Sequence, residues 1–111
     1  MKFPFFKKWP MPPIRKFESE FIKEHPNYRL VNIDTCYYDF NKDALIYFIT
    51  KTERDKEYFL KNLFEECKKV YHDELVKSNL LDIETFEYIV LSREDIDKRY
   101  LSNLYFAELD N

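Results

Sequence analysis

The segment from Thr52 to Asn79 constrains the fold more than any other part of the chain. Apolar side chains recur in it at helical spacing, at Leu60, Leu63, Phe64, Cys67, Val70, Tyr71 and Leu75. Charged side chains of alternating sign recur every four residues on the opposite side, at Glu57, Lys61, Glu65, Lys69, Asp73 and Lys77. Together these two rows predict one long helix with a single apolar side. Such a helix needs a broad apolar surface to lie on.

The chain contains no glycine. Phosphate-binding loops, dinucleotide-binding turns and nucleophile elbows need backbone that approaches a ligand closely, so these kinds of site are disfavoured. Thr52, with Asp55 three residues later, is expected to cap the start of the long helix, and Asn79 to close its end. Asparagine tolerates left-handed backbone, so we expect it in place of glycine at the junctions, at Asn27, Asn41, Asn79 and Asn103.

Two β-rich runs before the long helix predict a hairpin, with strands at about 29–38 and 44–52 joined by a turn at 39–43. One face of the first strand is expected to carry Val31, Ile33 and Tyr37. The other face is expected to carry Leu30, Asn32, Asp34, Cys36 and Tyr38. The second strand is apolar on both sides, which predicts a central strand covered on both faces. A third strand is expected at 83–91.

Two shorter helices are expected around these elements. Residues 13–25 predict a short helix that Pro26 stops, with an apolar face of Ile14, Phe17, Phe21 and Ile22. Ser92 is expected to cap another helix from about residue 93, with Asp95 as the acid of the cap, while residues 104–109 fit either a helix extension or an edge strand. The sequence therefore predicts an α+β fold in the order α-β-β-α-β-α. Its small sheet combines a β-hairpin with a third strand, and one long and two shorter helices pack on it.

Residues 1–13 are expected to form an arm that precedes a single domain over residues 14–111. Four of the chain's five prolines interleave there with aromatic side chains, at Phe3, Phe5, Phe6 and Trp9. Proline at this density blocks helices and central strands and favours extended backbone. The aromatic groups then pack on this domain, on a second copy, on a partner or at a membrane surface.

Charge and length narrow the classes of partner and compartment. The first 15 residues carry four cationic side chains and no acid, and the whole chain carries −3, so residues 16–111 carry −7. An acidic body disfavours nucleic-acid binding. No apolar run is long enough to insert into a membrane, no secretory signal is evident, and two cysteines make no disulfide framework, so a cytoplasmic protein is expected. The residue usage is typical of AT-rich coding, as in a low-GC bacterium, its phage or a mobile element.

No constellation in the sequence predicts catalysis, a metal site or a cofactor. Cys67 and His72 are five residues apart on the predicted helix and diverge around it, so we expect Cys67 and Cys36 to be structural thiols. No pair of cysteines or histidines has metal-ligand spacing. His25 is expected to interact favourably with the dipole at the C-terminal end of its helix. We therefore expect no catalytic residue, no metal ligand and no cofactor.

The positive signal is the aromatic content, because Phe, Tyr and Trp make up 19% of the chain. Aromatic residues are favoured at protein interfaces. The leading hypothesis is therefore a small, acidic, non-catalytic interaction module, such as an inhibitor, an immunity-type protein or an adaptor, that binds another protein. The candidate contact residues are Phe5, Phe6, Trp9, Tyr37, Tyr38 and Tyr88. The arm could also form a homodimer.

Two other functions remain open at this point. One is a small-molecule-binding domain or minimal enzyme, with a pocket between the sheet and the long helix. Its polar lining would consist of Asn32, Asp34, Cys36 and Glu87. The other is a structural subunit of a larger assembly that uses the arm at residues 1–13.

Overall fold

The structure, a computed structural model, describes residues 12–99 of the chain. Helix α2 (Pro13–Glu24) and the 3-10 turn η1 (Pro26–Tyr28) precede strands β1 (Leu30–Tyr38) and β2 (Asp43–Thr50). Helices α3 (Glu53–Asn62) and α4 (Phe64–Ser78) come next, followed by strand β3 (Thr85–Ser92) and a helix over residues 93–99. The predicted α+β fold and its element order are confirmed.

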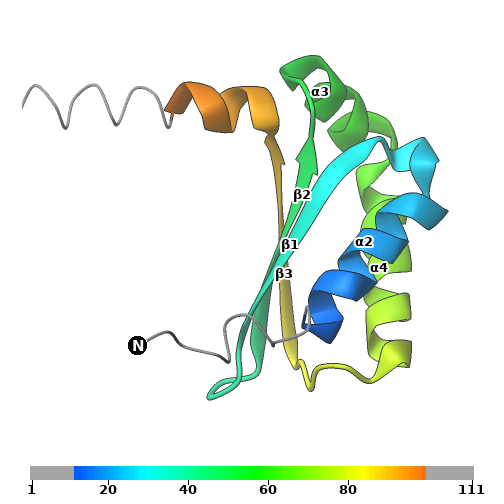
Figure 1. Ribbon diagram of the computed structural model, residues 1–111, viewed down its shortest axis with the longest axis vertical. Helices are drawn as coiled ribbons and strands as arrows, with labels where there is room; N and C mark the ends of the chain where they lie inside the picture. Colours follow the sequence, from blue (N-terminus) through cyan, green and yellow to red (C-terminus); the bar gives the residue numbers. More distant parts are fainter. Residues whose placement is uncertain (1–11, 100–111) are drawn as a thin grey trace, which may run out of the picture.

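The three strands form one mixed sheet in the order β1-β2-β3. Strands β1 and β2 are antiparallel, as a hairpin requires, whereas β2 and β3 are parallel. A parallel neighbour needs a crossover, and α3 and α4 supply it between the two strands. Figure 1 shows α2 and α4 side by side over one face of the sheet, which we call the inner face. Strand β2 is central, as predicted.

Aromatic packing between the inner face and the helices forms the core. Phe48 of β2 is fully buried and lies 5.6 Å, centroid to centroid, from Tyr71 of α4 and 5.9 Å from Phe59 of α3. Tyr71 in turn lies 5.0 Å from Phe21 of α2. Edge-to-face pairs at these distances stabilise a core beyond the area that they bury. Three helices are thus held to the sheet through one connected group of rings.

The long helix predicted over residues 52–79 is interrupted at Leu63. Its backbone leaves helical geometry there, with φ −125° and ψ −18°, so α3 and α4 are separate helices. A straight helix over residues 53–78 would be about 39 Å long, whereas an eight-residue strand spans about 26 Å. The break lets α3 turn over the end of the sheet and bury Phe59. Of the predicted charged row, Glu65 pairs with Lys68 at 3.3 Å rather than with a residue four positions away.

The predicted faces of β1 are wrong at the start of the strand. An irregularity in the pairing between Leu30 and Asn32 shifts the register there. Leu30 is therefore buried in the core, while Val31, expected on the side of Ile33, is 45% exposed. A β-bulge has this effect because one extra residue breaks the alternation of faces.

The predicted helix caps are confirmed. Thr52 Oγ1 accepts a hydrogen bond from the Asp55 amide at 3.1 Å, and Ser92 Oγ accepts one from the Asp95 amide at 3.0 Å. These bonds satisfy amide groups that the first turn of a helix leaves free.

Left-handed backbone occurs at one of the predicted asparagines. Asn79 has φ 58° after α4, but Arg29 and Lys42 adopt this geometry instead of Asn27 and Asn41. Asn41 accepts a hydrogen bond from the Asp43 amide with its side chain instead. The carbonyl of Lys42 accepts from the Glu84 amide at 2.8 Å, a contact between distant segments that sequence spacing does not show. Asn103 lies outside the described residues.

Replacing Phe48 with alanine is expected to lower the free energy of unfolding by about 3–5 kcal/mol, because the ring packs against α3, α4 and β3 and its removal leaves a cavity. Urea unfolding followed by circular dichroism measures this loss. Phe40, in the hairpin turn, is 84% exposed, so Phe40→Ala is the matched control and should change the value by less than about 0.5 kcal/mol. Equal losses in both variants would contradict the described core.

Candidate functional site

Three of the predicted contact residues, Tyr37, Tyr38 and Tyr88, lie within the described residues, and they do not form one surface. Tyr37 is on the inner-face side of β1 and its hydroxyl donates to the carbonyl of Asp82 at 2.8 Å. Tyr88 stacks on Phe48 at 5.6 Å, at the margin of the core. Tyr38 is 49% exposed and points to the other face of the sheet. The remaining three, Phe5, Phe6 and Trp9, lie outside the described residues.

The opposite side of the sheet, which we call the outer face, faces away from α2 and α4. Strand alternation and register assign these side chains to it: Asn32, Asp34, Cys36, Tyr38, Asp43, Leu45, Tyr47, Ile49, Glu87, Ile89 and Leu91. Ile49 is assigned to this side and lies outside the core cluster, but at 8% exposed it contributes little open surface. The sequence predicted that β2 is covered on both faces. Helices α2, α3 and α4 cover only its inner face.

The outer face has an apolar band across β2 and β3. Tyr47 stands opposite Ile89 and Ile49 stands opposite Leu91 in the parallel register, so four large side chains form one block. Ile89 is 38% exposed. Sequence reasoning had found the apolar character of β2 on both sides but not the parallel neighbour that widens the band.

Next to this band is a small acidic pocket. It has a volume of about 130 Å³, and Tyr38, Asp43, Leu45 and Glu87 contribute to its lining. Within residues 12–99 neither of its two carboxylates forms an ion pair with a lysine or arginine, whereas Asp34, further along β1, binds Arg15 at 2.8 Å. In the described part of the chain, the pocket therefore offers two acids without a basic partner beside apolar walls.

A second polar group of residues lies at the free edge of β1. Glu18 of α2 is 2% exposed and accepts from the Thr35 amide at 2.5 Å, while Arg15 donates to the Thr35 carbonyl at 3.1 Å. Arg15 also binds Glu18 at 2.6 Å. These two side chains satisfy the edge of the strand as a neighbouring strand would, which is a known way to protect sheet edges.

The edge of β1 also borders a cavity at this end of the sheet. The cavity has a volume of about 520 Å³, and its charged lining includes Arg15, Glu18 and Asp34. Arg15 forms ion pairs with both Glu18 and Asp34, so these three charged side chains are already paired with one another. The arrangement is typical of a structural polar cluster.

The four residues expected to line a pocket under the long helix do not do so. Asn32, Asp34, Cys36 and Glu87 are all on the outer face, away from α4. Asn32 and Asp34 border the cavity at the β1 edge instead. Glu87 is two strands away from them, since it pairs with Leu45, which in turn pairs with Cys36.

Both cysteines have environments that disfavour the thiolate. Burial raises the pKa of Cys67 to about 12, and burial together with the nearby Asp34 raises the pKa of Cys36. Nucleophilic cysteines need the opposite shift. The geometry therefore favours two inert thiols, as the sequence predicted.

Iodoacetamide at about pH 8 is expected to modify Cys36 slowly and Cys67 only after unfolding, because burial keeps the Cys67 thiol protonated and covered. Mass spectrometry of the intact chain, with and without urea, measures both rates. Cys36→Ala provides the control, since its remaining thiol should stay unmodified in the native chain. Rapid native labelling of that variant would contradict the described burial.

Burial of Glu18 raises its pKa above the ordinary value of 4.5, although the hydrogen bonds from Thr35 and Arg15 oppose the shift. The folded chain then binds a proton more tightly than the unfolded chain does. Between the two pKa values this group therefore makes folding less favourable as pH rises. We expect the free energy of unfolding of the wild type, relative to Glu18→Gln, to fall as pH rises from the ordinary value of 4.5 through the raised pKa of Glu18. Urea unfolding across this range tests it, and a difference that rises would contradict it.

No helix within residues 12–99 is both long enough and apolar enough to cross a membrane. Comparison of the chain with protein families, with curated proteins and with solved structures gives no match.

Proposed function

We propose that the chain is a non-catalytic protein-interaction module whose outer face binds a partner segment with basic and apolar side chains. The observation that carries this proposal is the acidic pocket beside the apolar band. Inhibitors, immunity-type proteins and adaptors act by such binding. The proposal places the protein in the cytoplasm, where its two cysteines would stay reduced.

The pocket fits a single basic side chain. Its volume of about 130 Å³ is below the range of roughly 300–1,000 Å³ that is typical of small-molecule sites. The methylene groups of a lysine or arginine would lie along Leu45 and the Tyr38 ring, and its charged end would reach Asp43 and Glu87. A charge-assisted hydrogen bond to either carboxylate would give the contact both strength and direction.

The adjoining band supplies the apolar part of the surface. Tyr47, Ile49, Ile89 and Leu91 are contiguous with the pocket along β2 and β3. Apolar burial provides affinity, while the acids around it steer a basic partner and repel nucleic acid. A face-to-face dimer is disfavoured, because two copies would bring Asp43 and Glu87 of one chain against the same acids of the other, and neither acid pairs with a lysine or arginine within residues 12–99.

An array of immobilised decapeptides tests this surface, each peptide having one lysine or arginine flanked by Phe, Trp, Tyr or Leu. The labelled full chain is expected to bind these peptides and to ignore the same array with glutamate in place of the basic residue. Glu87→Gln should weaken binding about tenfold, as the loss of one charge-assisted contact predicts.

Glu57→Gln is the matched control, because Glu57 is an exposed acid on α3, and it should leave binding unchanged. Equal affinity for both arrays, or equal effects of the two variants, would overturn the proposal. So would a chain that occupies its own outer face by forming a concentration-dependent dimer in light scattering.

A further inference from the structure

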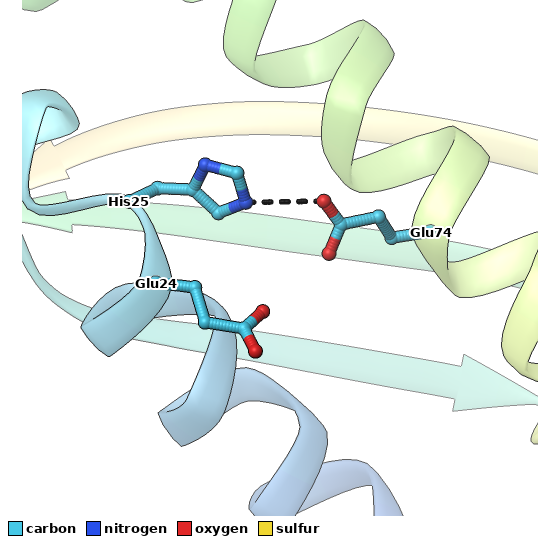
Figure 2. A group of neighbouring side chains, drawn as sticks. All are labelled: Glu24, His25 and Glu74. Carbon is cyan, nitrogen blue, oxygen red and sulfur yellow. Dashed lines mark hydrogen bonds and ion pairs between the residues drawn. The ribbon is translucent and has the colours of Figure 1, made fainter.

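Three potential metal ligands meet at the end of α2, on the helical side of the sheet. Figure 2 shows Glu24 and His25 at the end of this helix, with both side chains directed toward Glu74 of α4. One ligand atom from each residue lies within 4.8 Å of the other two. The outer face is on the other side of the sheet, so this cluster is independent of the surface proposed above.

The local sequence explains why these groups converge. Pro26 disfavours helical backbone at the residue before it, so α2 ends at Glu24 and His25 adopts φ −126° and ψ 62°. The imidazole then packs against the Phe21 ring at 4.4 Å, with the two rings tilted by 37°, and stacks on Tyr28 at 5.5 Å, which fixes the plane of the ring. Aromatic packing thus orients a potential nitrogen ligand before any metal binds.

The ligand atoms are close enough for a zinc site after small side-chain movements. His25 Nε2 lies 3.0 Å from Glu74 Oε2. Two ligand atoms bound to zinc at about 2.0–2.2 Å in a tetrahedral site are about 3.3–3.5 Å apart. A cation between them would replace the proton that the present hydrogen bond shares. Glu24 is exposed, so its side chain is free to close the remaining gap by rotation.

The charges in the cluster favour a cation as well. Glu74 forms an ion pair with His25, and within the described residues neither Glu24 nor Glu74 pairs with a lysine or arginine. Two carboxylates close together repel each other unless something neutralises them. Structural packing alone accounts for the His25–Glu74 hydrogen bond. The second carboxylate, Glu24, is what favours a cation, because it places a third ligand atom within 4.8 Å of both groups.

We infer that Glu24, His25 and Glu74 form a binding site for a divalent transition-metal ion, with zinc as the ion that fits best. One imidazole nitrogen and two carboxylate oxygens suit zinc better than magnesium or calcium, which prefer oxygen ligands alone. Three protein ligands leave the fourth position open to water. The ion would join the end of α2 to α4 through His25 and Glu74, which are 49 positions apart in the sequence.

Zinc titration of the full-length chain by calorimetry is expected to show one ion bound per chain. Zinc should also raise the melting temperature, because an ion that binds only the folded chain stabilises it by mass action. Magnesium should do neither. Cobalt in place of zinc should give the visible absorption of a four-coordinate site, which a purely structural ion pair cannot produce.

Glu24→Gln is the decisive variant, since Glu24 is exposed and the His25–Glu74 pair remains intact in it. It should weaken zinc binding at least roughly 10- to 100-fold, because that loss is typical of residues that only orient a metal ligand and Glu24 would be a ligand itself. His25→Gln should abolish the cobalt spectrum.

Two matched controls lie nearby: Glu20→Gln removes an exposed acid one turn earlier on α2, and His72→Gln removes the chain's other histidine. Both should bind zinc as the wild type does. Undiminished binding in Glu24→Gln and His25→Gln, or loss of binding in His72→Gln, would overturn the inference.

Discussion

The ring of Phe48 is the contact on which the rest of the structure depends. It is fully buried in the central strand and is packed by aromatic side chains of α3, α4 and β3. Because these rings all approach from one side, the helices gather on the inner face. The outer face then keeps apolar side chains that α2, α3 and α4 do not cover. The candidate binding surface is a consequence of this one-sided core.

The break at Leu63 has a similar role in arranging the molecule. It divides the crossover into a part that closes the end of the sheet and a part that lies along it. The crossover delivers β3 in the parallel direction, and this places Ile89 and Leu91 beside Tyr47 and Ile49. The width of the apolar band therefore depends on how the helices are connected, as well as on the residues in the strands.

Periodicity predicted the elements of the fold well, because apolar spacing and caps such as Thr52 and Ser92 act over a few residues. It did not predict features set by distant contacts. The bulge that buries Leu30, the left-handed Lys42 and the break at Leu63 all depend on how separate segments pack. The candidate sites likewise depend on contacts between residues that are distant in the sequence. The sequence predicted Tyr38 in a partner contact and Glu87 in a different, small-molecule pocket, yet the register places both in one pocket. The approach of His25 to Glu74 has no spacing motif.

The contacts of Arg15 and Glu18 with Thr35 have a consequence for how the sheet can grow. They occupy the peptide group that a strand from another molecule would need at this position of β1. Addition of a foreign strand on that side would first have to displace a buried carboxylate and its arginine. A sequence change that removed either side chain would expose a bare strand margin, and self-association through that margin would then compete with correct folding.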